Sequence, residues 1–317
     1  MEFILNKIKE YNKILIFGHV RPDGDCIGSQ YGLARIIKES FPNKEVIVSG
    51  ETSDYVSFIG EPTMANDADF KGSLGICVDI ANSERVSDQR YKNCDYVIKI
   101  DHHPNVEAFG DYNYVDDTAP ACAQIITEFY SNYNKELKMT TEAAMALYVG
   151  ILTDTGRFKF DSVKSKTFKM ASILLDFGIS LGYIDNKLSV ETVKTLKLKG
   201  YCLENFNVTE NGFAYIIITR DIINKYGVSD EEAANQVTTI STIKGCPSWA
   251  LFIEYPKEIR IRLRSRGPII NSLAERWGGG GHPKASGATL GTWDKLPEFL
   301  KEIDKIVKEY KENNLDD

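Results

Sequence analysis

Four short apolar runs separated by helical patterns fill the first 190 residues, and this alternation limits the fold more than any other feature of the sequence. The runs have the length and composition of buried strands and cover residues 13–19, 45–50, 74–81 and 95–103. Helical patterns lie between them, the clearest at residues 26–40. Parallel strands need a crossover connection, so strands joined by helices indicate βαβ units. The sequence therefore predicts an α/β fold with a doubly wound, mostly parallel sheet.

Polar motifs follow these strands and hold three of the four histidines of the chain. GHVRPDGDCIGS (18–29) comes after the first strand, Asp79 closes the third, and IKIDHHPN (98–105) closes the fourth. In open α/β sheets, ligands bind at the carboxyl ends of the strands. We therefore expect all three motifs at one edge of the sheet.

Imidazole beside carboxylate is the donor set that suits Mn²⁺-like divalent metals. A buried carboxylate such as Asp79 is costly unless it is paired or bound to a metal. Two metals that share one carboxylate are typical of phosphoryl transfer. The sequence therefore predicts a two-metal site. Its candidate ligands are His19, Asp23, Asp25, Asp79, His102 and Asp154.

Each acidic candidate also has a plain structural explanation. Pro-Asp-Gly-Asp, which contains Asp23 and Asp25, is a common turn sequence. Asp79 could cap a following helix. Asp154 stands in ILTDTGRF, where Asp-Thr-Gly is also a good end for a helix. The Asp-His-His triplet 101–103 is harder to explain structurally, since two adjacent histidines end an apolar strand.

The pattern changes beyond residue 205. Strand-like runs cover residues 212–219, 248–255 and 258–266, and helical patterns lie near 229–240, 271–277 and 294–312. We therefore expect a first domain at residues 1–188, a helical linker at 189–205 and a smaller α/β domain at 206–317.

An arginine-rich strand and a glycine run stand out in the second domain. In RIRLRSR, the arginines at 260, 262, 264 and 266 should share one strand face. A solvated edge is the alternative explanation, and for Arg260 the better one. The glycines of GGGGHP (278–283) let backbone N–H groups approach an anion, whereas four residues are too short for a useful linker. The sequence thus predicts a phosphate site near Arg264, Ser265 and His282.

Charge and cysteine usage restrict the partners. The net charge is −7, which argues against long DNA or RNA as the main ligand. No apolar stretch approaches the roughly 20 residues of a membrane span, and the N-terminus is an amphipathic helix pattern rather than a signal peptide. The six cysteines form no CxxC pair. Reduced, buried thiols in a cytoplasmic protein are the natural interpretation.

The motifs HVRPDGDCIGSQ, VDIANSER, IDHHPN, TDTGRF, LRSRG and GGGGHPKASG, in this order, resemble those of the DHH/DHHA1 phosphoesterases. The chain is most similar to the branch of this family that combines nano-RNase and pAp-phosphatase activity, and the resemblance covers nearly its whole length. It implies a DHH domain at 1–188, a DHHA1 domain at 206–317 and an active site in the cleft between them.

The resemblance also implies roles for single residues. His19, Asp23 and Asp79 resemble ligands of a first Mn²⁺, and Asp79 would bridge to a second Mn²⁺. The ligands of the second ion would be Asp25, Asp79, His102 and Asp154. His103 would contact the scissile phosphate, and Asp101 would hold a histidine. The substrate-anchoring positions match Arg264, Ser265, Gly279, Gly280, Gly281 and His282. Cys26 stands where the family often has alanine, and a thiol there could confer sensitivity to oxidation.

The implied activity is Mn²⁺-dependent phosphoester hydrolysis, with Mg²⁺ or Co²⁺ as substitute ions and a bridging hydroxide activated by both metals. The implied substrates are short single-stranded oligoribonucleotides, dinucleotides such as pApA, and 3′-phosphoadenosine 5′-phosphate (pAp), with no membrane and no long duplex DNA as partner. The resemblance leaves a homodimer open. Two other functions also remain open, a RecJ-like exonuclease on long strands and a non-catalytic nucleotide-binding module. A family II pyrophosphatase would lack the GGGGH motif.

Overall fold

The computed structural model describes residues 1–104 and 106–314, and the chain divides into two compact units, Met1–Val190 and Glu191–Asp317. Asn105 of the IDHHPN motif and the last three residues of the predicted second domain lie outside the described part. Each unit has its own sheet and its own core.

The N-terminal unit contains a five-stranded parallel sheet in the order β2-β1-β3-β4-β5. Its strands are β1 (Lys13–Phe17), β2 (Glu45–Ser49), β3 (Ser73–Val78), β4 (Tyr96–Asp101) and β5 (Tyr112–Val115). The first four are the strands that the sequence predicted, so the α/β class and the parallel sheet are confirmed. The fifth was not predicted, because its residues are only half-buried and lack an apolar run.

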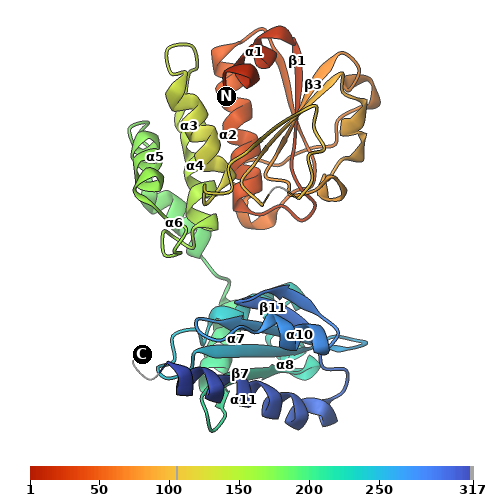
Figure 1. Cartoon of the computed structure of the whole chain (residues 1–317), viewed down its shortest axis with the longest axis vertical. Coiled ribbons are helices and arrows are strands. Elements are labelled where there is room, and N and C mark those ends of the chain that lie inside the picture. The colour runs from red at the N-terminus through yellow and green to blue at the C-terminus, as the bar shows by residue number, and fades with distance from the viewer. Residues whose placement is uncertain (105, 315–317) are drawn as a thin grey trace. The chain divides into compact units, whose positions relative to one another are not determined.

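Helices cover one face of this sheet, as Figure 1 shows for α2, α3 and α4. The helices of the unit are α1 (Glu2–Glu10), α2 (Gly24–Ser40), α3 (Cys122–Asn132), α4 (Thr141–Asp154), α5 (Ser165–Leu175) and α6 (Leu181–Ser189). Ile14 and Ile16 of β1 belong to the core on the helical side. Leu15 and Phe17 belong to a second core with Tyr91, which comes from the short 3₁₀ segment Gln89–Asn93. The second face is thus covered by loops and 3₁₀ turns.

Glycines allow α2 and α4 to pack in close contact. A Cβ at Gly28 of α2 would lie 2.5 Å from the backbone oxygen of Ala146, and one at Gly150 of α4 would lie 2.8 Å from Oδ1 of Asp25. Only glycine fits such a backbone approach. The helices run in opposite directions, because Gly24 meets Thr153 while Arg35 reaches the Glu142 carbonyl. The start of α2 therefore lies beside the end of α4.

The C-terminal unit contains a six-stranded mixed sheet in the order β10-β11-β9-β8-β7-β6, in which only β7 and β8 are parallel. Its strands are β6 (Asn207–Val208), β7 (Phe213–Ile218), β8 (Ser248–Glu254), β9 (Ile259–Ser265), β10 (Gly280–His282) and β11 (Ala285–Thr289). Trp249 and Leu251 of β8 face one core, and Ala250 and Phe252 face the other. Helices therefore pack on both faces.

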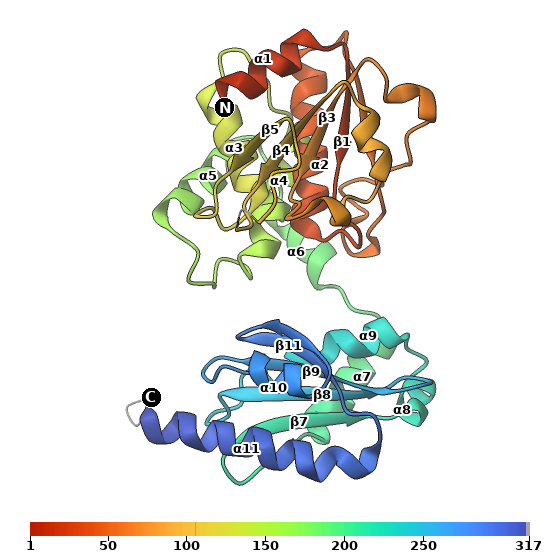
Figure 2. The same ribbon diagram turned by 45° about the vertical axis from the view of Figure 1, so that its right-hand side comes forward.

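The helices of this unit are α7 (Val193–Glu204), α8 (Arg220–Tyr226), α9 (Asp230–Ala234), α10 (Asn271–Arg276) and α11 (Leu296–Asn313). Figure 2 shows α11 along the sheet, where it buries Phe299 and Ile303. Helix α7 falls within the predicted linker, and its Leu198 and Cys202 pack into the core of this unit. Among the described residues, no helix combines the length and apolar composition that crossing a membrane requires.

Candidate active site

Candidate metal ligands meet at the carboxyl edge of the N-terminal sheet. Three follow the ends of β1, β3 and β4, and three lie at the start of α2 and the end of α4. In this order they are His19, Asp79, His102, Asp23, Asp25 and Asp154. The close packing of α2 against α4 accounts for the second group, since it brings the two helix ends together.

Asp79 occupies the centre of this cluster. Its Oδ2 lies 3.6 Å from Nε2 of His19, and its Oδ1 lies 3.3 Å from Nε2 of His102. The carboxylate is buried, and Oδ1 receives no hydrogen bond within the described residues. The backbone of Asp79 is left-handed, with φ of +60°, and its N–H donates to the Ile100 carbonyl. Aspartate tolerates this region better than most residues, so the turn after β3 aims the carboxylate between two imidazoles.

Backbone carbonyls orient both histidine rings. Nδ1 of His19 lies 2.9 Å from the Val20 oxygen, and Nδ1 of His102 lies 3.2 Å from the Ala119 oxygen. A carbonyl only accepts, so each Nδ1 carries the proton and donates it. In the neutral ring, Nε2 then presents a lone pair toward the carboxylates, which is how proteins usually prepare histidine for a metal.

Asp25 is held by the N-terminus of α3. Its Oδ2 accepts the N–H of Cys122 at 2.6 Å, and its Oδ1 accepts that of Ala123 at 2.9 Å. Oδ2 also lies 3.8 Å from Nε2 of His102, and Oδ2 of Asp154 lies 3.4 Å from the same nitrogen. One donor atom from each of Asp25, His102 and Asp154 lies within 4.8 Å of the other two.

Asp23 caps a helix and also lies beside His19. It caps α2, with Oδ1 accepting the N–H groups of Asp25 and Cys26. The same oxygen lies 3.8 Å from Nε2 of His19, and the side chain is largely exposed. Asp23 therefore has a structural role as a helix cap, which the sequence did not predict, and this role does not remove it from the cluster.

The carboxylates of the cluster disfavour one another's charge. Burial raises the pKa of Asp25 well above its usual range, and Asp79 and Asp154 add to the effect. Burial also raises the pKa of Asp154 to about 6, although His102 opposes it. For His102 itself burial lowers the pKa, but Asp79 and Asp25 outweigh it and raise the pKa to about 10. The site therefore retains protons that a divalent cation would displace.

Asp101 holds His103. Its Oδ1 accepts the N–H groups of His102 and His103 at 2.9 and 3.2 Å, and Nδ1 of His103 at 2.8 Å. Burial alone would raise the pKa of Asp101, but the bond to His103 outweighs it and lowers the pKa. His103 is half-exposed, and its Nδ1 lies 3.7 Å from Oδ1 of Asp79. Its Nε2, not used by Asp101, can reach a ligand at the cluster.

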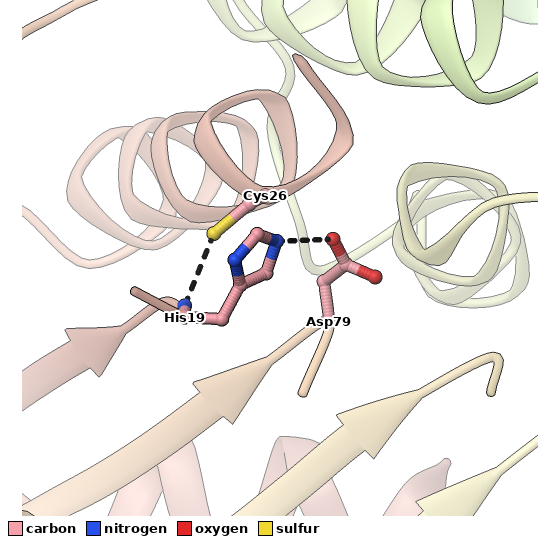
Figure 3. Close-up of side chains that lie close together, drawn as sticks. All are labelled: His19, Cys26 and Asp79. Carbon is pink, nitrogen blue, oxygen red and sulfur yellow. Dashed lines mark hydrogen bonds and ion pairs between the residues drawn. The ribbon is translucent and has the colours of Figure 1, made fainter. Parts of the chain in front are cut away.

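Sequence reasoning gave little weight to Cys26, which joins His19 and Asp79 in a buried group of donor atoms. Figure 3 shows the His19 ring between the two, with Nε2 toward Asp79. The thiol accepts the His19 backbone N–H at 3.3 Å. Burial raises the pKa of Cys26 to about 11, although His19 opposes it. The thiolate is the reactive form of cysteine, and the sensitivity of Cys26 to oxidation stays a prediction.

Two cationic residues near the cluster were missed. Nη2 of Arg85 lies 3.3 Å from Nδ1 of His19, and Lys99 is fully buried beside Asp101. Each had a signal in the sequence. Arg85 belongs to the VDIANSER motif, and Lys99 interrupts the apolar strand YVIKID.

In the C-terminal unit, the pairing of three strands aligns Arg264 with His282. His282 of β10 is paired with Ala285 of β11, which is paired with Arg264 of β9. The neighbouring row on the same face is Gly280, Gly287 and Arg262. Directly paired residues share a sheet face, so small residues separate the cationic side chains from His282. The predicted alternation of β9 is confirmed, since Ile261 and Leu263 are buried.

Some of the residues that were predicted to bind phosphate have structural roles in the hairpin and the turn. A Cβ at Gly279 would overlap the Gly287 carbonyl, and Gly281 has φ of +135°, so both glycines are needed for the hairpin itself. Ser265 is buried, and its hydroxyl donates to the Pro268 carbonyl at 2.6 Å and accepts the N–H of Gly267. Arg264 is half-buried and donates to the Leu263 carbonyl, and burial lowers its pKa.

A parallel-sheet domain that gathers histidines and aspartates at its carboxyl edge, followed by a mixed-sheet domain, is the architecture of a class of hydrolases. Residues 13–151 match the DHH family, N-terminal domain, and residues 211–309 match the DHHA1 domain. The chain belongs to the DHH/DHHA1 family of phosphoesterases.

Relatives in this family are similar over nearly their whole length. The chain is 37% identical to the bifunctional oligoribonuclease and PAP phosphatase NrnA of Bacillus subtilis (strain 168), over 97% of this chain and 98% of that protein. It is 39% identical to the probable enzyme of the same name from Streptococcus mutans, over 96% and 98% of the two chains. The crystal structure of an exopolyphosphatase-related protein from Bacteroides fragilis matches with a TM-score of 0.86, 25% identity and 97% coverage of each chain.

Proposed function

We propose that this protein hydrolyses short oligoribonucleotides, including dinucleotides such as pApA, to mononucleotides, and pAp to AMP, with Mn²⁺ as its metal. Two relatives, one named as a bifunctional oligoribonuclease and PAP phosphatase and the other as a probable one, are 37% and 39% identical over nearly the whole chain. The observation that carries the proposal is Asp79, whose buried carboxylate lies between His19 and His102 with one oxygen free of hydrogen bonds from the described residues.

The donor set fits a pair of divalent metals. Neighbouring carboxylates raise the pKa of the buried Asp25, and the Nε2 atoms of His19 and His102 point toward the carboxylates. Such a site favours the binding of positive charge. Neutral nitrogen with carboxylate oxygen suits Mn²⁺ better than Mg²⁺. Bound metals would act as Lewis acids toward the phosphoryl oxygens and a water nucleophile. We assign His19, Asp23 and Asp79 to one ion, and Asp25, Asp79, His102 and Asp154 to the other.

His103 and Asp101 would act on the substrate rather than on the metals. The hydrogen bond from Nδ1 of His103 to Asp101 fixes the orientation of the ring. An imidazole that is protonated at both nitrogens can donate from Nε2 to an oxygen of the scissile phosphate. Charge-assisted donors of this kind stabilise the negative charge of phosphoryl transfer.

Residues of the C-terminal unit would bind the rest of the nucleotide. Arg264 and His282 lie on one row of the sheet, with small residues between them. A guanidinium can hold a phosphate by two parallel hydrogen bonds. The bare backbone at Gly280 leaves room for a ligand, because no described residue other than its chain neighbours has a heavy atom within 4 Å of the position of its missing Cβ. Gly279, Gly281 and Ser265 would contribute by shaping this hairpin and turn.

Turnover measurements on purified full-length protein test the proposal. The substrates are pAp, pApA and single-stranded RNA up to about 20 nucleotides, each with Mn²⁺ and with a chelator. We expect turnover of pAp and of the shortest RNAs with Mn²⁺, a steep fall with RNA length, and no turnover with the chelator. Processive degradation of the longest strand would favour a RecJ-like enzyme. Nucleotide binding without turnover under every condition would favour a non-catalytic module.

A further inference from the structure

A fully buried lysine lies in β4, two residues before Asp101. Lys99 has no exposed surface, and it interrupts a strand whose neighbouring residues Ile98 and Ile100 are apolar. Its Nζ donates to the Ala81 carbonyl at 3.0 Å and to the Glu107 carbonyl at 3.1 Å, and lies 3.2 Å from Oδ2 of Asp101. The ammonium thus donates hydrogen bonds to two carbonyls and has the Asp101 carboxylate as its third polar neighbour.

The partners of Lys99 lie in the two loops that carry the cluster. Ala81 lies two residues after Asp79 in the loop that follows β3, and Glu107 lies in the loop that follows β4 and the histidine pair. A second contact joins the same loops, because the Glu107 carboxylate accepts both the N–H and the hydroxyl of Ser83, at 2.9 and 2.7 Å. Lys99 is thus the buried end of a polar network between the loops.

The two oxygens of Asp101 have different surroundings, and Lys99 causes the difference. Oδ1 accepts three hydrogen bonds from His102 and His103. Oδ2 receives no hydrogen bond from the described residues and faces only the ammonium of Lys99 as a charged neighbour. The terminal torsion of an aspartate is broad and roughly two-fold. The charge of Lys99 therefore narrows this torsion to the plane in which one oxygen faces the ammonium and the other holds His103.

We propose that Lys99 is a positioning residue of the active site. Through Asp101 it fixes the ring of His103, and through Ala81 and Glu107 it fixes the distance between Asp79 and the histidine pair. A buried ion pair contributes little net stability compared with well-packed apolar side chains, so the placement of the loops explains this lysine better than stability does. The inference rests on the proposed function, since it assigns Lys99 to the same site.

Lys99→Met tests the proposal, because methionine has a similar length and no charge. Lys13→Met is the matched control: Lys13 pairs with Glu45 and Asp69, and it lies at the start of β1, at the opposite end of the strand from the cluster. We expect Lys99→Met to lower kcat for pAp and to weaken Mn²⁺ binding about 10- to 100-fold, as is usual for residues that orient metal ligands. KM should stay within about threefold of the wild-type value, since the proposed anchoring contacts of Arg264 and His282 remain. Lys13→Met should change none of these quantities.

Mn²⁺ affinity is measured by paramagnetic resonance and folding by thermal unfolding, independently of turnover. If kcat and Mn²⁺ affinity of folded Lys99→Met both stay within about threefold of wild type, the proposal is overturned. If that variant does not fold, Lys99→Gln takes its place with the same criteria, because its amide can still donate to the two carbonyls. Failure of both variants to fold would show a role in stability instead, and would also overturn the proposal. A wild-type protein inactive on every nucleotide would refute the proposed function rather than this inference.

Discussion

Replacing Asp79 with asparagine removes the charge at the centre of the cluster and little else. Asparagine has nearly the same shape and tolerates the left-handed backbone of this position. The turn after β3 should therefore persist. One oxygen becomes an NH₂ group, which cannot ligate a metal, and the other loses its negative charge.

The expected loss follows from the position of the carboxylate. At an effective dielectric constant of about 20, unit charges about 4 Å apart attract each other by about 4 kcal/mol. One such contact corresponds to about a thousandfold in binding, since about 1.4 kcal/mol is a factor of ten. Asp79 faces both His19 and His102 and hence both proposed ions. We expect Asp79→Asn to lower kcat/KM for pAp by at least about a thousandfold.

Thermal unfolding separates loss of metal from loss of fold. Mn²⁺ at about 100 times its Kd should stabilise the wild-type protein by about 2.7 kcal/mol, and this gain should largely vanish in Asp79→Asn. Without metal, the variant should still unfold cooperatively, because asparagine keeps the shape and the backbone conformation of this turn. Activity above a few per cent of the wild-type rate, or an unchanged Mn²⁺-induced shift in Tm, would refute the bridging position of Asp79.

Three further outcomes are expected. Arg264→Ala and His282→Ala should each lower kcat/KM for pAp about ten- to a hundredfold, because each removes a charge-assisted contact of roughly 1.5–3 kcal/mol. Hydrolysis of bis-p-nitrophenyl phosphate should stay unchanged. Equal losses on both substrates would contradict the anchoring role. Gly28→Ala should destabilise the fold by about 1–3 kcal/mol in urea unfolding, because its Cβ would lie 2.5 Å from the Ala146 carbonyl oxygen; an unchanged midpoint would contradict the close packing of α2 and α4. Mn²⁺ binding at neutral pH should release protons, because the pKa of His102 is raised to about 10 in the metal-free protein; equal calorimetric heats in buffers of different ionisation enthalpy would contradict this.

The strand pattern and the position of the polar motifs could be predicted because both are local properties of the sequence. Each of β1 to β4 is a short, mainly apolar run, and the polar residues that follow it must then lie at the carboxyl edge. The same reasoning predicted that His19, Asp79 and His102 lie near one another, but it gave no distances. It could not show that Asp25 is held by the start of α3, because that contact joins residues 97 positions apart.

The missed strands depend on pairing rather than on composition. β10 consists of Gly280, Gly281 and His282, a sequence with no strand preference of its own, and it forms because it pairs with β11. The glycine run therefore suggested a loop. The partners of Lys99 could not be predicted from composition either. A lysine in an apolar strand is unfavourable by itself, and only the folded chain brings the Ala81 and Glu107 carbonyls to it.

All of the candidate metal ligands lie between His19 and Asp154, within the unit Met1–Val190. The chemistry of the site is therefore inherited as one contiguous segment. If the proposed function holds, mutations in the other unit would change which nucleotides are accepted while the proposed metal ligands stay in place. For the engineer, the same arrangement makes recombination between relatives practical: exchanging Glu191–Asp317 alone should transfer substrate preference while leaving the catalytic apparatus of the recipient in place.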